Sequence, residues 1–114
     1  MAQYLMLIYE DEARWAEAAP EAAEQVMKQH EEFVARHKPI LRGGHPLQPA
    51  STATSLRRQG SGIAVTDGAV VETKEAVGGY YVVEAADLDE AMAVAKDIPA
   101  PFGGVEIRPV REFS

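Results

Sequence analysis

Two segments with the apolar spacing of an α-helix lie between strand-like segments, and this order constrains the fold more than any other feature of the chain. The first helical segment runs from Pro20 to Pro39, and glutamates in its first turn favour a helix start there. The second spans residues 87–99 and begins with a capping box formed by Asp87 and Glu90. Each helix is therefore expected to connect two strands.

Short apolar or β-branched runs predict the strands. They lie at residues 3–9, 40–49, 52–57, 62–67, 78–85 and 104–110. The third and fourth runs are expected to form a hairpin, joined by a four-residue turn that contains Gly60. The polar segment before Pro20 predicts a connection or a loose helical turn, with Trp15 as its one large apolar anchor.

The order of these elements predicts one α+β domain over residues 1–114, a ferredoxin-like sandwich of the dimeric α/β-barrel type with an extra β-hairpin. Two helices on one side of such a sheet leave its other face uncovered. A domain of this size is expected to cover that face with a second copy, so the sequence predicts a homodimer.

The charge and residue usage exclude several classes of protein. A formal net charge of -7 repels a phosphate backbone, so no nucleic-acid partner is expected. The apolar run Tyr4 to Tyr9 is too short to span a membrane and has no basic flank. The chain contains no cysteine, which suits the cytoplasm and excludes thiolate chemistry.

His30 lies on the same helical face as Val26 and Phe33, so it points toward whatever this helix packs against. One interpretation is a core or edge histidine with a single hydrogen bond. The other is an imidazole in a pocket, where partial burial brings its titration near neutral pH. His37, at the end of the helix, is interpreted as structural.

The stretch TDGAVVETKE, residues 66–75, is the densest polar segment of the chain. It is either a solvated turn with surface ion pairs or a site in which the Asp67 carboxylate is a general base and Lys74 stabilises negative charge. His45 follows two glycines and precedes a proline, so its ring is held at a defined place. Asp67 with His45 is the first candidate acid-base pair, and His30 is the competing partner.

The remaining candidates are ligand-binding residues. Arg108 in the last strand could bind a carboxylate if it points inward. Tyr80 and Tyr81 must face opposite sides of their strand, so one of them could line a cavity of the dimer, and Tyr80 is the candidate. Glu75 accompanies Lys74 in this set. The chain has no metal-binding histidine spacing, no nucleophilic-serine elbow and no glycine-rich nucleotide loop, so no metal or cofactor is expected.

The segments GGHPLQP, TATSLR, VTDGAVVETKEAVGGYYVVEA and VEIRPV together resemble the YCII-related proteins of the DGPF branch over essentially the whole chain. The resemblance implies a ferredoxin-like fold that dimerises through its sheets. Two departures stand out. The Asp-Gly-Pro-Phe of the branch is Asp67-Gly68-Ala69-Val70 here, and His45 occupies a position that is usually acidic.

The resemblance implies two kinds of function. The first is a pocket near the dimer interface for a small anionic organic ligand, with cofactor-free acid-base chemistry by a His-Asp pair; one relative removes chloride from a chlorinated muconate-type acid. The alternative is a non-catalytic ligand- or partner-binding module linked to transcriptional regulation with an extracytoplasmic-function sigma factor. The sequence does not decide between an enzyme and a binding module.

Overall fold

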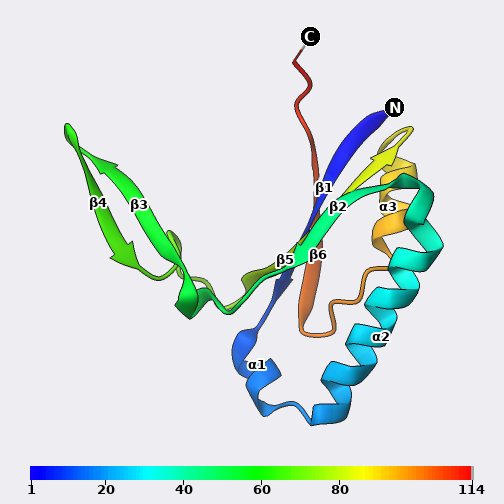
Figure 1. The fold of residues 1–114 in the computed structure, drawn as a ribbon, viewed down its shortest axis with the longest axis horizontal. Helices are drawn as coiled ribbons and strands as arrows, with labels where there is room; N and C mark the ends of the chain where they lie inside the picture. The colour runs from blue at the N-terminus through cyan, green and yellow to red at the C-terminus, as the bar shows by residue number, and fades with distance from the viewer. Residues whose placement is uncertain (114) are drawn as a thin grey trace.

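The computed structural model describes residues 1–113 and has α+β architecture with two antiparallel sheets. The larger sheet has the strand order β2-β5-β1-β6, and each neighbouring pair in it is antiparallel. Its strands are β1 (Ala2–Glu10), β2 (Leu41–Pro46), β5 (Ala76–Ala85) and β6 (Gly103–Pro109). With a helix between β1 and β2 and another between β5 and β6, this arrangement is compatible with a ferredoxin-like fold (Figure 1).

Helices α2 (Pro20–His37) and α3 (Leu88–Ala95) lie on the same side of the larger sheet (Figure 1). Helix α2 begins at Pro20, where the missing N–H costs no hydrogen bond. Helix α3 begins after Asp87, whose carboxylate accepts a hydrogen bond from the Glu90 N–H at 2.9 Å. Within the described part of the chain, no helix combines the length and the apolarity that crossing a membrane requires.

Three short helical elements complete the chain: α1 (Glu12–Glu17) and the 3₁₀ turns η1 (Lys38–Ile40) and η2 (Ala50–Thr52). Of the two alternatives for the polar segment before Pro20, the structure therefore has the helical one, a short helix. Its helix forms because the buried Asp11 carboxylate accepts hydrogen bonds from the N–H groups of Ala13 and Arg14. Such a cap satisfies two of the free donors at a helix start.

Strands β3 (Thr54–Gln59) and β4 (Gly62–Asp67) form a separate two-stranded sheet. Gln59 pairs with Gly62, so the turn has two residues rather than the expected four, and Gly60 adopts the positive φ of 62° that such a tight turn needs. This hairpin projects from the side of the larger sheet opposite α2 and α3 (Figure 1). The radius of gyration, 16.0 Å, therefore exceeds the ~13 Å of a compact domain of this length.

The core lies between the larger sheet and the two helices. Ala91, Val94 and Ala95 of α3 are buried in it, whereas α2 contributes one buried residue, Phe33, from its second half. The sheet contributes the alternating side chains of β1 and β5, which are Tyr4, Met6, Ile8, Val83 and Ala85. The first half of α2 is therefore left without core contacts of its own.

Candidate functional site

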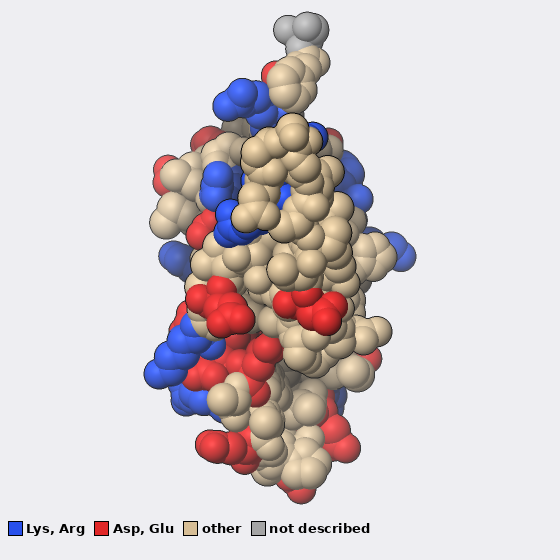
Figure 2. Space-filling view, turned by 90° about the vertical axis from the view of Figure 1, so that its left-hand side faces the viewer, with Lys and Arg blue, Asp and Glu red and all other residues tan. Residues whose placement is uncertain are grey.

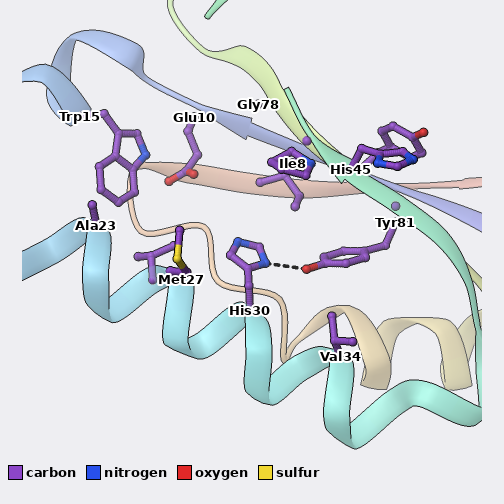
Figure 3. Close-up of a pocket in the computed structure, with 15 residues that line it drawn as sticks. Ile8, Glu10, Trp15, Ala23, Met27, His30, Val34, His45, Gly78 and Tyr81 are labelled. Atoms are coloured by element: carbon purple, nitrogen blue, oxygen red, sulfur yellow. Dashed lines mark hydrogen bonds between the residues drawn. The ribbon is translucent and has the colours of Figure 1, made fainter. Parts of the chain in front are cut away.

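A cavity lies between the first half of α2 and the larger sheet, beside the end of β1 (Figure 3). Its volume, about 420 Å³, is within the range of small-molecule sites in proteins. The wall is mainly apolar and includes Ile8, Trp15, Val26, Met27, Val34 and Pro46. The side chains of Glu10, His30 and Tyr81 add acid-base groups to it.

The cavity exists because small residues face each other across it. Ala23 lies on the helix side, and Gly44, Gly78 and Gly79 lie on the sheet side. A Cβ on Gly44 would come within 2.6 Å of the Tyr81 ring. Glycine at this position therefore allows the Tyr81 ring to lie directly against β2.

His30 and Tyr81 form a hydrogen bond across the cavity. The distance between His30 Nδ1 and the Tyr81 Oη is 2.7 Å, and both rings are half-buried (Figure 3). The ring of Phe33 supports this geometry, because it packs against Tyr81 with 4.7 Å between ring centroids. The second ring nitrogen of His30, Nε2, points away from Tyr81 into the open space near Glu10 (Figure 3).

Burial determines the protonation of this pair. It lowers the pKa of His30 below its ordinary value, and the Glu10 carboxylate partly opposes the shift. Burial also raises the pKa of the Tyr81 phenol. At neutral pH the pair is therefore a neutral imidazole and a neutral phenol. Either tautomer of His30 leaves Nε2 available to a ligand, as a donor or as an acceptor.

Glu10 occupies the cavity wall because of its position on β1. It continues the row of Tyr4, Met6 and Ile8, which alternate along the strand and face the helices. Its Oε2 accepts a hydrogen bond from the Phe102 N–H at 3.1 Å. Among the described residues that line the cavity, Glu10 is the one carboxylate, and none is lysine or arginine.

The two histidines proposed as acid-base groups lie on opposite faces of the sheet. The ring of His45 packs against Tyr80 with 5.9 Å between centroids, and His30 bonds to Tyr81, the next residue along β5. Because successive side chains of a strand alternate, Tyr80 and Tyr81 face opposite sides, as the sequence predicts. His45 is exposed at the edge of the cavity, and only His30 presents its ring to the interior (Figure 3).

The other predicted site residues lie outside this cavity. Asp67 ends β4, while Lys74 and Glu75 are in the exposed segment before β5. Arg108 follows Ile107, which packs on the core, so Arg108 lies on the opposite face, where it binds Glu106 at 3.2 Å. Among the hydrogen bonds of residues 1–113, none joins Asp67 to a histidine.

The stretch 66–75 borders a second, larger groove of about 720 Å³ at the base of the hairpin. Its middle part lines the groove, together with Tyr9, Glu12 and the segment 47–53. The Glu12 carboxylate is already occupied there by the Ala50 N–H at 2.9 Å. Of the described residues, no histidine lines this groove. The smaller cavity is the better candidate, since it gathers a base, a phenol and a carboxylate.

Three residues with a clear role in the structure were not among the sequence candidates. Glu10 directly follows the apolar run of β1, and continued alternation along the strand could have placed it on the helix side. Strand alternation shows that Tyr81 and Tyr80 face opposite sides but not which side Tyr81 faces, so its hydrogen bond to His30 could not be predicted. Asp97 is the third: His37 binds it at 2.8 Å, a structural role for His37 that agrees with the sequence interpretation.

Metal binding finds no support in the described part of the chain. Nowhere in residues 1–113 do three or more His, Asp or Glu side chains gather in a group that could hold a metal ion.

Comparisons with known proteins place these residues in a wider context. The family model of the YCII-related domain matches residues 2–114. An uncharacterised protein of Rhizobium meliloti (strain 1021) is 33% identical to this chain, over 94% of the chain and 90% of its own length. The family match extends through β1, α2 and β5, three of the elements that line the cavity.

Proposed function

The chain belongs to the YCII-related family, and we propose that it binds a small, largely apolar organic molecule in the cavity beneath α2 and exchanges a proton with it through His30. Activity within this family is not established by its name, so the proposal rests on the cavity itself. The finer placement in the DGPF branch, the cytoplasmic location and the homodimer expected from the sequence are parts of the same proposal.

The observation that supports the proposal is the 2.7 Å bond between His30 and Tyr81 inside an apolar cavity. When Nδ1 carries the proton and donates a hydrogen bond to the Tyr81 oxygen, Nε2 has a free lone pair. This nitrogen can take a proton from a bound ligand, whose electron pair remains on the ligand. The imidazolium so formed is stabilised by the nearby Glu10 carboxylate, and the chemistry needs no cofactor.

A ligand screen with a blocked cavity tests the binding part of the proposal. Ala23 on α2 lines the cavity, so Ala23→Trp places a large ring in it. Ala35 is an exposed residue of the same helix outside the cavity wall, and Ala35→Trp is the matched control. Apolar fragments should bind the wild type and Ala35→Trp and should lose binding to Ala23→Trp. Equal binding to all three proteins would place the fragments elsewhere and refute the proposal.

An NMR pH titration tests the proton-transfer part. His30 should titrate below the ordinary histidine pKa in the wild type. Glu10→Gln should lower this pKa further, since the carboxylate is what raises it. Asp67→Asn should leave it unchanged, because Asp67 lies in the separate hairpin sheet. If Asp67→Asn changes the pKa of His30 instead, the two residues form the Asp67–His30 pair that the sequence analysis gives as an alternative.

The homodimer is supported by the face of the sheet that the helices leave uncovered. Leu5, Leu7, Tyr80 and Val82 alternate with the core residues and so point to this face. Figure 2 views the molecule from the side on which the hairpin projects and shows uncharged residues along the middle, with basic residues beside them in the upper half and acidic residues in the lower half. The hairpin projects on the same side, so a second copy docked here would also meet the hairpin.

The alternative, a partner-binding module linked to an extracytoplasmic-function sigma factor, is favoured by one feature. Leu56, Ile63 and Val65 of the hairpin are more than half exposed, at 60%, 54% and 64%. If these side chains bind such a factor, Leu56→Ser should weaken binding to a purified sigma factor from the same organism in calorimetry. Ala23→Trp, which fills the cavity, should leave that binding unchanged. Binding lost only in the cavity variant would contradict the alternative.

A further inference from the structure

The wall of the cavity has an unbalanced charge. Glu10 contributes a carboxylate, and the described lining residues include no lysine or arginine to neutralise it. The cationic residues expected to bind an anionic ligand lie elsewhere: Lys74 is in the exposed segment before β5 and Arg108 is on the opposite face of the sheet. An anion in this cavity would meet a like charge, and the described lining residues offer no lysine or arginine as its counter-charge.

The Glu10 carboxylate is held in place but is not paired with a cation. One oxygen accepts the Phe102 N–H at 3.1 Å, which fixes the side chain against the wall. Among the ion pairs of residues 1–113, none includes Glu10. Arg14, on neighbouring α1, packs its guanidinium over the Phe102 ring at 4.7 Å. Glu10 therefore retains the capacity to bind a positive group from a ligand.

The surroundings of Glu10 suit an organic cation. The indole of Trp15 forms the wall on one side of Glu10 and the thioether of Met27 faces the cavity from α2 (Figure 3). An indole ring attracts a cation through its negative face. His30 adds no positive charge at neutral pH, since burial lowers its pKa.

We propose that the ligand of this cavity is a hydrophobic organic cation, such as a protonated amine, with Glu10 as its counter-ion and Trp15 beside its charged group. This inference rests on the proposed function, because it assigns the charge of the ligand that the cavity binds. It departs from the anionic ligand that the sequence suggested.

Three probes of nearly equal size and shape test the charge: 4-phenylbutylamine, 4-phenyl-1-butanol and 4-phenylbutyrate. Trp15 is the one tryptophan in the chain and lines the cavity, so its fluorescence reports binding directly. At pH 7.5 the wild type should bind the amine about tenfold or more tightly than the alcohol, and the carboxylate most weakly.

Glu10→Gln isolates the carboxylate. The amide oxygen can still accept the Phe102 N–H, so the fold is expected to persist, which a thermal melt checks. This variant should lose the preference for the amine, while its affinity for the alcohol stays close to that of the wild type. Glu17→Gln, an exposed acidic residue on α1 outside the cavity wall, is the matched control and should keep the preference.

The outcomes separate the two proposals. If the alcohol or the carboxylate binds at least as tightly as the amine, and Ala23→Trp abolishes that binding, the cavity is a ligand site and the cationic ligand is wrong. If no probe alters Trp15 fluorescence in the wild type, the charge assignment falls together with the apolar-ligand site. The wild-type ranking of amine over alcohol decides the inference even if Glu10→Gln does not fold.

Discussion

Gly44 is the residue on which the geometry of the His30–Tyr81 pair most directly depends. A methyl group there would meet the Tyr81 ring at 2.6 Å and the Tyr80 carbonyl oxygen at 2.7 Å. Gly44→Ala should therefore displace Tyr81 and destabilise the fold by about 1–3 kcal/mol, as overpacking does. Urea unfolding measures the loss, and the His30 ring resonances report the broken bond.

Gly43→Ala is the control for this substitution. Gly43 is the neighbouring residue in β2, and a Cβ there has no atom within 4 Å. Its variant should retain the wild-type His30 resonances and lose far less stability. If Gly43→Ala and Gly44→Ala are equally destabilised, the close approach to Tyr81 is not what requires the glycine.

The partial burial of His30 also predicts a pH dependence of stability. Because its pKa is lower in the folded state than in the unfolded chain, the unfolded chain binds the proton first as the pH falls. The free energy of unfolding should thus decrease as the pH drops from 7.5 through about 6.5 and below. Of the groups that face His30, Glu10 moderates this loss, and Tyr81 stays protonated throughout the window.

Urea unfolding at pH 7.5 and pH 5.5 checks this dependence in two variants. His30→Gln should flatten the change between the two pH values, because glutamine does not titrate. His45→Gln should leave the change as in the wild type, since His45 is exposed at the edge of the cavity. A wild type with equal stability at both pH values would contradict the assignment.

At the scale of elements, α2 is fixed to the rest of the molecule mainly through its second half. Phe33 is buried, and His37 binds the Asp97 carboxylate at 2.8 Å beside the end of α3. Arg36 reaches the same carboxylate at 3.3 Å. The first half of α2, by contrast, borders the cavity and contributes no buried residue to the core.

Asp97→Asn should weaken this attachment. The hydrogen bond from His37, with smaller contributions from Arg36, lowers the pKa of Asp97, so the carboxylate stabilises the fold above its unfolded pKa of about 3.8 and loses this effect as the pH falls further. The variant should be less stable at pH 7 and should show faster amide exchange in residues 30–37. Its difference from the wild type should shrink below pH 4.

Asp89→Asn, an exposed acidic residue in the first turn of α3, is the comparison. Helix α2 should exchange in this variant as it does in the wild type. Unchanged exchange of residues 30–37 in Asp97→Asn would show that Phe33 alone holds the helix.

The elements were more predictable than the site. Periodicity and start signals located both long helices, because Pro20 and the Asp87 cap each act on the few residues that directly follow them in sequence. The bond between His30 and Tyr81 joins residues 51 positions apart, and it depends on how α2 packs on the sheet. Strand alternation predicts that Tyr80 and Tyr81 lie on opposite faces of the sheet, but it does not predict which of them faces the helix.

The candidate pair of Asp67 with His45 illustrates the same limit. Each residue follows a recognisable local signal, a turn dipeptide or a glycine pair. The structure places Asp67 in the hairpin sheet and His45 in the larger sheet, and only the long-range pairing of strands separates them. Glu10 was overlooked for the opposite reason, since a charged residue at a strand end resembles ordinary surface.

At the scale of the whole molecule, the proposed homodimer gives a further prediction. Leu56 and Val65 pair with each other on one face of the hairpin and are exposed. Replacing both with serine should weaken self-association about tenfold or more if a second copy covers them. Analytical ultracentrifugation across a concentration series measures the change.

Thr66→Ala changes the opposite face of the same hairpin and should leave self-association intact. Small-angle scattering adds an independent check, because the isolated chain has a radius of gyration of 16.0 Å and a dimer must exceed it. A wild type that scatters as the isolated chain at all concentrations would rule the dimer out.

The hairpin has a consequence for how such a protein can change over evolutionary time. It is attached to the body at its base, where the Ser55 hydroxyl donates to the Gly68 carbonyl, and it contributes no side chain to the core. Substitutions and length changes in β3 and β4 therefore leave the helices, the larger sheet and the cavity largely unaffected. The chain can accumulate new contact surfaces on this arm while natural selection preserves the cavity beneath α2.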